Sequence, residues 1–567
     1  MKQTERWLPV LLLLLAAALT IGPAGWGDLY NETDGQYGGA ARVMAGGGSW
    51  LIPENNGTPR LVKPPFLYWT MAASMRIFGV NAFAARLPSA LATTLLVAVT
   101  FLIGSRMGGA WRGFLAGAIL LTSLGLFTLG RIVMPEPMFA ALIAAALYCV
   151  LRGHDEAGHR RKWFAGFWLC AALASLTKGW HGLLYPLAIV GMAAIFCKGS
   201  RVNLRGLLSW QGPLIFCALN LPWYFYIETR FPGYVNNLFF AEQLGHFTGS
   251  SAPATHYTIV PRWQFLLLHL AWFFPWSAVV LAGLWRVADP RGLISPRPSM
   301  PFISTLICAW AAVILGSVLL AGQRQDYYAM AMWPAFALGA AALIENRSLR
   351  PAAVFLTLLF ALGFVGAMAI PLFAPGAATA SVAERSTAWT TVTNFDRTVW
   401  RSLRSTALLT LGGATLFSLV STLLRGRPQV FAMLAASACL ALGAVSGTSL
   451  VSPFFSLARA APAILEAASP DTRLVYDGGI DTGSSLLFYT DLPLTLLDQN
   501  PDEDFLTRKF GIGRHLFLTT DQMAGRWKSG APVILITEAG KLPQWEATLG
   551  VSLVPLARCG TQVVLKN

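Results

Sequence analysis

Long apolar runs recur along most of this chain, separated by short polar connections. A helix that crosses a membrane needs roughly 20 mainly apolar residues. By that criterion the pattern predicts about thirteen spans, at residues 7–25, 84–104, 112–130, 135–152, 163–177, 180–197, 206–226, 264–285, 302–321, 327–344, 351–373, 403–424 and 430–450. The sequence therefore predicts a mainly α-helical, multi-pass membrane protein.

The pattern changes after about residue 452, where short apolar runs alternate with turn residues. Runs at 474–476, 486–489, 516–518, 533–536 and 562–565 have the length of buried strands, and residues 522–527 suit a short helix. We therefore predict two domains: a transmembrane domain at 1–452, with loops outside the membrane, and a small soluble α/β domain at 453–567.

Composition supports this division and gives the chain an orientation. The 567 residues are 55% hydrophobic and only 12% charged, with a formal net charge of +15. The basic residues gather in every second connection, for example at Arg152, Lys198 and Arg201, which places those connections inside by the positive-inside rule. The C-terminal domain then lies outside. No basic patch with the spacing of a nucleic-acid site is present in the sequence, so no nucleic-acid partner is predicted.

The loop after the first span, residues 28–69, contains the residues that best suit chemistry. Glu32 and Asp34 lie just beyond the first span, and short helices are expected around 38–45 and 66–78. Lys63 precedes Pro64 and Pro65, which stiffen the backbone and exclude a helix at that point. A carboxylate that accepts a proton and a cation that holds a phosphate, both at a bilayer surface, suit a lipid-linked substrate.

Two segments of this loop, residues 32–44 and Lys63-Pro64-Pro65 with the aromatic residues that follow, resemble the first periplasmic loop of bacterial GT-C glycosyltransferases. The most similar group is the protein mannosyltransferase-like and aminoarabinose (lipid A) transferase superfamily. The resemblance implies a transferase of EC class 2.4 in the bacterial inner membrane, with its site facing the periplasm. It would move a sugar from a polyprenyl-phosphate donor, with inversion, to a lipid, glycan or protein acceptor, as in modification of lipid A or of cell-envelope glycans.

Three carboxylates are predicted to be catalytic. Asp34 is the predicted base, because a single carboxylate can both relieve the acceptor of its proton and stabilise positive charge at the sugar C1. Glu32 is the rival, or orients the acceptor; Glu136, between two prolines, resembles the second acidic position of GT-C enzymes. The structural alternatives are a helix cap for Asp34 and a helix start for Glu136.

Four cations are predicted to bind the donor phosphate: Lys63, Arg131, Lys178 and Arg324. Lys63 could instead extend to the lipid headgroups, and Lys178 could instead be a cation that stabilises the C-terminal end of a helix. The residues predicted to contact the acceptor or the loops are Tyr37, Glu242, His246 and Tyr327. Under one topology the charged residues at span ends fall on the same side of the membrane, where ionisable groups often mark function.

No metal or other cofactor is predicted. A divalent metal is compatible with the family, but no ligand spacing indicates one, and Val62 stands where aminoarabinose transferases commonly have Glu. The competing functions are a transporter or flippase of lipid-linked sugars and a non-catalytic scaffold. A transporter would favour inverted repeats or charges at the bilayer midplane, and the sequence has neither.

Overall fold

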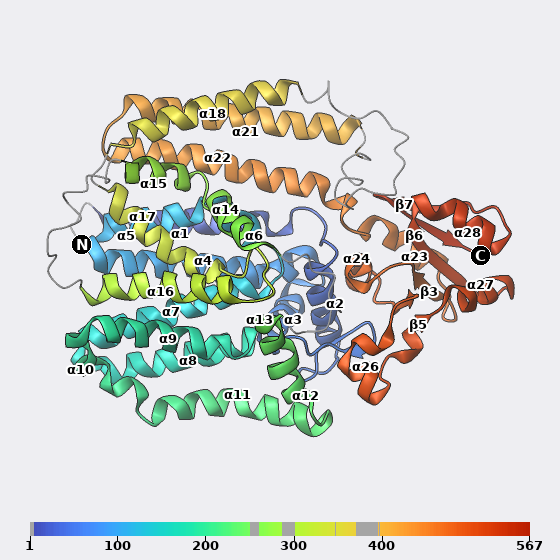
Figure 1. Cartoon of the computed structure of the whole chain (residues 1–567). Coiled ribbons are helices and arrows are strands. Elements are labelled where there is room, and N and C mark those ends of the chain that lie inside the picture. Colours follow the sequence, from blue (N-terminus) through green and yellow to red (C-terminus); the bar gives the residue numbers. More distant parts are fainter. Residues whose placement is uncertain (1–4, 250–259, 286–300, 346–347, 370–394, 396) are drawn as a thin grey trace.

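The computed structural model describes residues 5–249, 260–285, 301–345, 348–369, 395 and 397–567. Long helices lie alongside one another and form most of the molecule, and a smaller α/β domain lies at one end of them (Figure 1). The N-terminus and the short helix α10 (Arg201–Leu204) lie at the other end. This arrangement confirms the predicted fold class, a helical membrane domain with a small C-terminal α/β domain. The boundary at residue 452 stays a prediction.

Each predicted span coincides with a helix or with two consecutive helices. The helices of this part are α1 (Leu8–Thr20), α4 (Ala82–Gly108), α5 (Ala110–Leu121), α6 (Leu124–Leu129), α7 (Pro135–Asp155), α8 (Arg160–Lys178), α9 (His181–Phe196), α11 (Gln211–Arg230), α14 (Arg262–Trp272), α15 (Trp276–Trp285), α16 (Phe302–Leu320), α17 (Trp333–Ile344), α18 (Arg350–Met368), α21 (Arg397–Leu423) and α22 (Arg427–Val451). Within the described residues, 7 helical segments are long and apolar enough to cross a membrane, or 8 if the bent segment at 181–208 is one span. The remaining spans of the predicted thirteen fall on shorter, less apolar or broken helices.

The outer loops form helices of their own. The first loop contains α2 (Thr33–Ala45) and α3 (Phe66–Phe78), at the two places where short helices are predicted, with the small strands β1 (Glu54–Asn55) and β2 (Thr58–Pro59) between them. The second long loop contains α12 (Tyr234–Asn236), a π-helical turn at Asn237–Leu244 and α13 (Gly245–Thr248). These helices lie between the long helices and the α/β domain (Figure 1).

The C-terminal domain is a six-stranded mixed sheet in the order β5-β4-β3-β6-β8-β7. Its strands are β3 (Arg473–Tyr476), β4 (Leu494–Leu497), β5 (Phe517–Leu518), β6 (Val533–Glu538), β7 (Pro555–Cys559) and β8 (Gln562–Lys566), and its helices are α23 (Ala461–Ala467), α24 (Ile480–Gly483), α25 (Ser485–Tyr489), α26 (Phe505–Phe510), α27 (Thr520–Lys528) and α28 (Leu542–Leu549). Strands β3 to β6 are parallel, and β8 and β7 add antiparallel strands at one edge.

The strand predicted at 486–489 is wrong, because these residues form helix α25. Leu486, Leu487 and Phe488 are all buried, so the segment has no polar face that would distinguish a helix from a buried strand. Strands β4 and β7 were not predicted. The predicted strands at 474–476, 516–518, 533–536 and 562–565 overlap β3, β5, β6 and β8, and the predicted helix at 522–527 lies within α27.

Helix α25 packs on α2 and so joins the two parts of the chain. The α2 residue at the contact is Gly35, where a Cβ atom would overlap the backbone of Ser484 and Ser485. Close to it, the Glu32 amide donates to the Asp481 carbonyl at 2.6 Å, and the Asn31 amide donates to the Phe455 carbonyl at 2.9 Å. The C-terminal domain therefore fixes the start of α2.

Candidate active site

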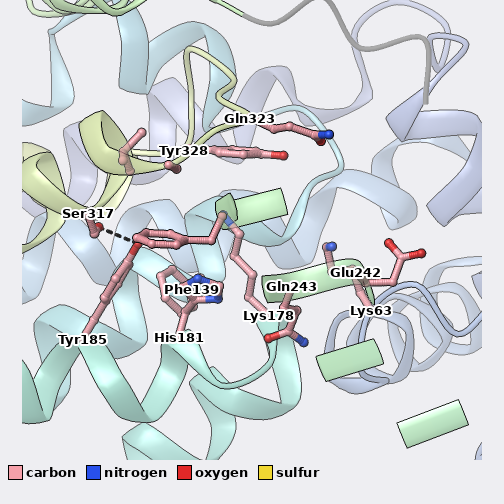
Figure 2. Close-up of a pocket in the computed structure, with 13 residues that line it drawn as sticks. Lys63, Phe139, Lys178, His181, Tyr185, Glu242, Gln243, Ser317, Gln323 and Tyr328 are labelled. Atoms are coloured by element: carbon pink, nitrogen blue, oxygen red, sulfur yellow. Dashed lines mark hydrogen bonds between the residues drawn. The ribbon is translucent and has the colours of Figure 1, made fainter. Parts of the chain in front are cut away.

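A cavity opens where the two outer loops meet the ends of α8, α9 and α16. The side chains that line it come from loops and helices far apart in the sequence: Lys63, Phe139, Lys178, His181, Tyr185, Glu242, Gln243, Phe247, Ser317, Val318, Ala321, Gln323 and Tyr328. Figure 2 shows Lys63 and Glu242 at one end, Tyr185 and Ser317 at the other, and Lys178 between them. Three residues predicted from the sequence, Lys63, Lys178 and Glu242, are thus brought to one space.

Lys178 is the last residue of α8, which ends because Gly179 takes a φ of 81° that favours glycine. Its ammonium lies 2.9 Å from Glu136 Oε1, and 5.5 Å and 4.8 Å from the ring centroids of Phe139 and Tyr328. The other oxygen of Glu136, Oε2, is buried and makes no hydrogen bond within the described part of the chain. This corner of the site thus holds a Lys178–Glu136 ion pair in which one carboxylate oxygen has no hydrogen-bond partner among the described residues.

Lys63 is half-buried in the extended segment before Pro64. Burial lowers the pKa of its ammonium below the usual 10.5; the positive charges of Lys178 and Arg60 act in the same direction, and Glu242 and Glu136 oppose them. Two cations thus share one desolvated space. Binding of an anion would relieve both the desolvation and the repulsion between them.

Glu242 and Gln243 reach the cavity from the π-helical turn at Asn237–Leu244. The Gln243 side chain accepts a hydrogen bond from the Trp180 amide at 3.2 Å, and it covers Gly179, where a Cβ atom would overlap the Gln243 amide group. The turn that carries Glu242 is therefore fixed against the end of α8 that carries Lys178. π-Helical turns occur frequently at functional sites.

The inner end of the cavity is aromatic and uncharged. Ser317 donates a hydrogen bond to the Tyr185 hydroxyl at 2.9 Å, and the rings of His181 and Phe139 pack on Tyr185 at 5.4 Å and 6.1 Å between centroids (Figure 2). Rings with polar tips of this kind suit an amphipathic ligand group such as a sugar.

Asp34 does not line this cavity. Its side chain is 0% exposed; Oδ2 lies 2.9 Å from Arg86 Nη2, and Oδ1 accepts the Val133 amide at 2.7 Å. The Tyr30 amide also donates to Oδ2, at 3.3 Å. With both oxygens engaged and no space beside them, this geometry argues against the predicted role of Asp34 as base.

Arg86 was not singled out from the sequence, although a charged residue inside an apolar span is itself a signal. It is 1% exposed and also donates to the carbonyls of Trp26, Gly27 and Asp28 at 3.0, 3.0 and 2.6 Å. Arg131, predicted to bind phosphate, belongs to the same cluster and donates to the Trp26 carbonyl at 2.9 Å. It is not among the residues that line the cavity.

Glu32 and Tyr37 lie on α2 and likewise outside the cavity lining. Glu32 caps the helix at a φ of 66°, unusual for a residue with a Cβ atom, and burial together with the nearby Asp481 carboxylate raises its pKa. Tyr37 stacks on Tyr68 at 5.3 Å between centroids, and the Arg60 guanidinium lies 5.3 Å from its ring. Glu32 thus contacts the α/β domain, and Tyr37 contacts the loop that contains Arg60.

The other predicted residues are not among the described residues that line the cavity. Arg324 is buried and donates to the backbone carbonyls of Val260, at 3.1 Å, and Ala321, so its guanidinium is occupied by backbone. Tyr327 contacts Tyr328 edge to face at 5.3 Å between centroids. His246 lies in α13, and its side chain falls outside what the structure describes.

A divalent metal does not fit the described residues. No group of three or more His, Cys, Asp or Glu side chains among them is close enough to hold a metal ion. Val62, next to Lys63, offers no side-chain ligand atom.

Part of the sequence is similar to known glycosyltransferases. Residues 44–236 match the family model described as dolichyl-phosphate-mannose-protein mannosyltransferase. An undecaprenyl phosphate-α-4-amino-4-deoxy-L-arabinose arabinosyl transferase of Pseudomonas fluorescens is 28% identical over 294 residues, 51% of this chain and 52% of that protein. The chain thus matches about half the length of this relative.

Solved structures match over nearly the whole chain. The crystal structure of ArnT from Cupriavidus metallidurans bound to undecaprenyl phosphate superposes with a TM-score of 0.80 at 20% identity, covering 98% of this chain and 97% of that one. The oligosaccharyltransferase of Archaeoglobus fulgidus gives a TM-score of 0.51 at 12% identity, covering 97% and 72%. The chain therefore has the fold of the aminoarabinose transferase structure and is similar in sequence to part of such transferases, and its long apolar helices indicate a multi-pass membrane protein.

Proposed function

We propose that this protein transfers a sugar from a polyprenyl-phosphate donor to an acceptor at the periplasmic face of the bacterial inner membrane. The P. fluorescens relative is named for an undecaprenyl-phosphate-linked aminoarabinose, and the C. metallidurans structure holds undecaprenyl phosphate. Both names support a lipid-linked sugar as the donor class. The acceptor would be a hydroxyl or amine of a membrane-borne or periplasmic lipid, glycan or protein.

The observation that supports this proposal most is the pair of lysines in one cavity. Lys63 and Lys178 come from different elements and face the same space, and the acids near them are Glu242 and Glu136. A sugar phosphodiester brings one negative charge, and its leaving group is an anionic phosphate, so the cations that bind the donor also stabilise the phosphate as it departs. Protonation of the leaving group is not required.

The distribution of charge supports the proposed orientation. Arg106, Arg152 and Arg160 lie with α10 at the end of the bundle away from the α/β domain, where Arg160 donates to Asn203 at 3.2 Å and Arg106 pairs with Asp155 at 2.5 Å. Basic residues favour the cytoplasmic side. The cavity and the α/β domain then face the periplasm.

Donor binding tests the role of the two lysines. Loss of one charge-assisted contact costs about 1.5–3 kcal/mol, so Lys63→Ala and Lys178→Ala should each weaken binding of a polyprenyl-phosphate sugar by about 10–150-fold. Binding is measured on protein in lipid nanodiscs, with the exposed Lys198→Ala as the matched control. Unchanged affinity in both cavity variants would rule out this phosphate site.

A second measurement separates transfer from transport. With a labelled donor, a transferase releases polyprenyl phosphate and places the sugar on a new molecule. A flippase would move the intact donor between leaflets of a proteoliposome and release no polyprenyl phosphate. That second outcome would overturn the proposed function.

A further inference from the structure

We infer that Glu242, on the π-helical turn, is the group that accepts the proton of the acceptor. This inference rests on the proposed function and deepens it, because it assigns the base of the same site. It replaces Asp34, whose carboxylate is enclosed by Arg86 and by two backbone amides.

Among the described residues that line the cavity, Glu242 is the only Asp or Glu. Glu136 lies nearby and its Oε2 has no hydrogen bond, but its Oε1 is paired with Lys178 at 2.9 Å, the residue is 5% exposed, and it is not among the lining residues. Glu32 lies at the contact between α2 and the α/β domain, close to Asp481. A base must reach the reacting proton, and Glu242 is the carboxylate that opens to the space beside the lysines (Figure 2).

Within the described part of the chain, the Glu242 carboxylate makes no hydrogen bond and no ion pair within 4.0 Å, although the Lys63 charge is close enough to be affected by it. The oxygens are therefore free to accept a proton, whereas those of Asp34 are occupied. An acid whose only role was to neutralise Lys63 would be expected to form a direct pair with it.

The surrounding structure holds the turn that carries Glu242 in place. Gln243 fixes the turn to the Trp180 amide, and the preceding segment is fixed by the α/β domain, where Lys509 on α26 donates to the Pro232 carbonyl at 2.6 Å. Leu506, also on α26, packs with Tyr234 and Leu238 in one buried cluster. The base is thus carried by a turn that both domains hold in place, as a catalytic group requires.

The acceptor oxygen or nitrogen forms a bond to the sugar C1 as the bond from C1 to the phosphate oxygen breaks, and the configuration at C1 is inverted. The electron pair of the broken bond stays on the phosphate, which departs as polyprenyl phosphate held by Lys63 and Lys178. The proton of the acceptor passes to Glu242 and then to water.

Glu242→Gln keeps the shape of the side chain but removes its ability to accept a proton. We expect a fall of about 10²–10⁴-fold in kcat, with donor affinity unchanged or tighter because a negative charge near the phosphate is lost. The acid limb of the kcat/KM profile should disappear. Glu242→Asp should recover part of the rate, and formate should partly restore Glu242→Ala, which a structural role would not allow.

The control is Glu503→Gln, an exposed acid of the α/β domain. All variants are first shown to be monodisperse and inserted, so that a folding defect is recognised. Near-normal turnover in Glu242→Gln overturns the inference, as does retention of its acid limb or loss of that limb in Glu136→Gln alone. If the wild-type protein itself releases no polyprenyl phosphate, the proposed function fails and this inference fails with it.

Discussion

Two clusters of charged residues include side chains of the first outer loop, and the two clusters differ in what surrounds them. In the cluster of Asp34, Arg86 and Arg131, the acid is 0% exposed and both of its oxygens have donors. In the cavity cluster, Lys63, Lys178 and Glu242 face a shared space, and Glu242 has no partner in the described structure. An acid with two cations is enclosed in one case and lines a cavity in the other.

This difference separates structural from chemical roles. A buried charge with all its partners in place holds segments together, and removing one partner leaves an uncompensated charge. A desolvated charge beside a cavity has lost water without gaining a full set of partners, so a ligand can supply the missing interactions. Charge and proximity to the membrane surface do not distinguish Asp34 from Glu242; the number of occupied hydrogen-bonding positions on each carboxylate does.

The largest expected effect comes from breaking the buried ion pair of Asp34 and Arg86. Asp34→Asn leaves the Arg86 guanidinium buried without its counter-ion, and such changes cost about 3–5 kcal/mol. We expect reduced insertion and a lower thermal midpoint in nanodiscs, with activity lost in proportion to folded protein. Asp34→Asn that is fully folded and inactive would instead restore Asp34 as the base.

A double variant sharpens this test. Asp34→Leu with Arg86→Met replaces the pair by apolar side chains, and such replacements are often neutral or stabilising where one partner alone is not. The double variant should therefore recover thermal stability relative to Asp34→Asn. If it also recovers turnover, the pair is structural.

A smaller effect is expected where the α/β domain holds the start of α2. Gly35→Ala would place a Cβ atom against the backbone of Ser484 and Ser485, and overpacking of this kind costs about 1–3 kcal/mol. We expect faster proteolysis between α22 and β3 and a lower turnover rate. Gly525→Ala, where the added Cβ atom meets nothing within 4 Å, is the control. Equal behaviour of the two variants would show that the interface is not tightly packed.

The smallest effect concerns pH and the cavity cluster of Lys63, Lys178 and Glu242. Because burial lowers the pKa of Lys63 below 10.5, the ammonium loses its proton at a lower pH than a surface lysine does. Affinity for a sugar phosphodiester, whose charge is constant in this range, should fall as pH rises, by up to about tenfold (about 1.4 kcal/mol) per unit above that pKa. Lys63→Met should bind weakly without this slope. A wild-type affinity that stays flat up to pH 10.5 would contradict the assignment.

Much of the fold follows from the sequence alone, because it depends on local patterns. The apolar runs specify where helices cross the membrane, and α2 and α3 form where short helices are predicted in the first loop. Lys63 and Lys178 are recognisable from their neighbours, since prolines follow one and a helix-ending glycine follows the other. Each of these features depends on residues within a few positions along the chain.

The division between the two clusters was decided only by the tertiary structure. Asp34 is enclosed because Arg86, 52 residues away, and the Val133 amide, 99 residues away, reach it from other elements. Glu242 opens to the cavity because a π-helical turn from the second loop is fixed against the end of α8. Long-range contacts determine whether a carboxylate is paired or free, and the spacing of residues in the sequence does not encode those contacts. Burial makes the contacts decisive, because a buried carboxylate has no water to replace a missing partner.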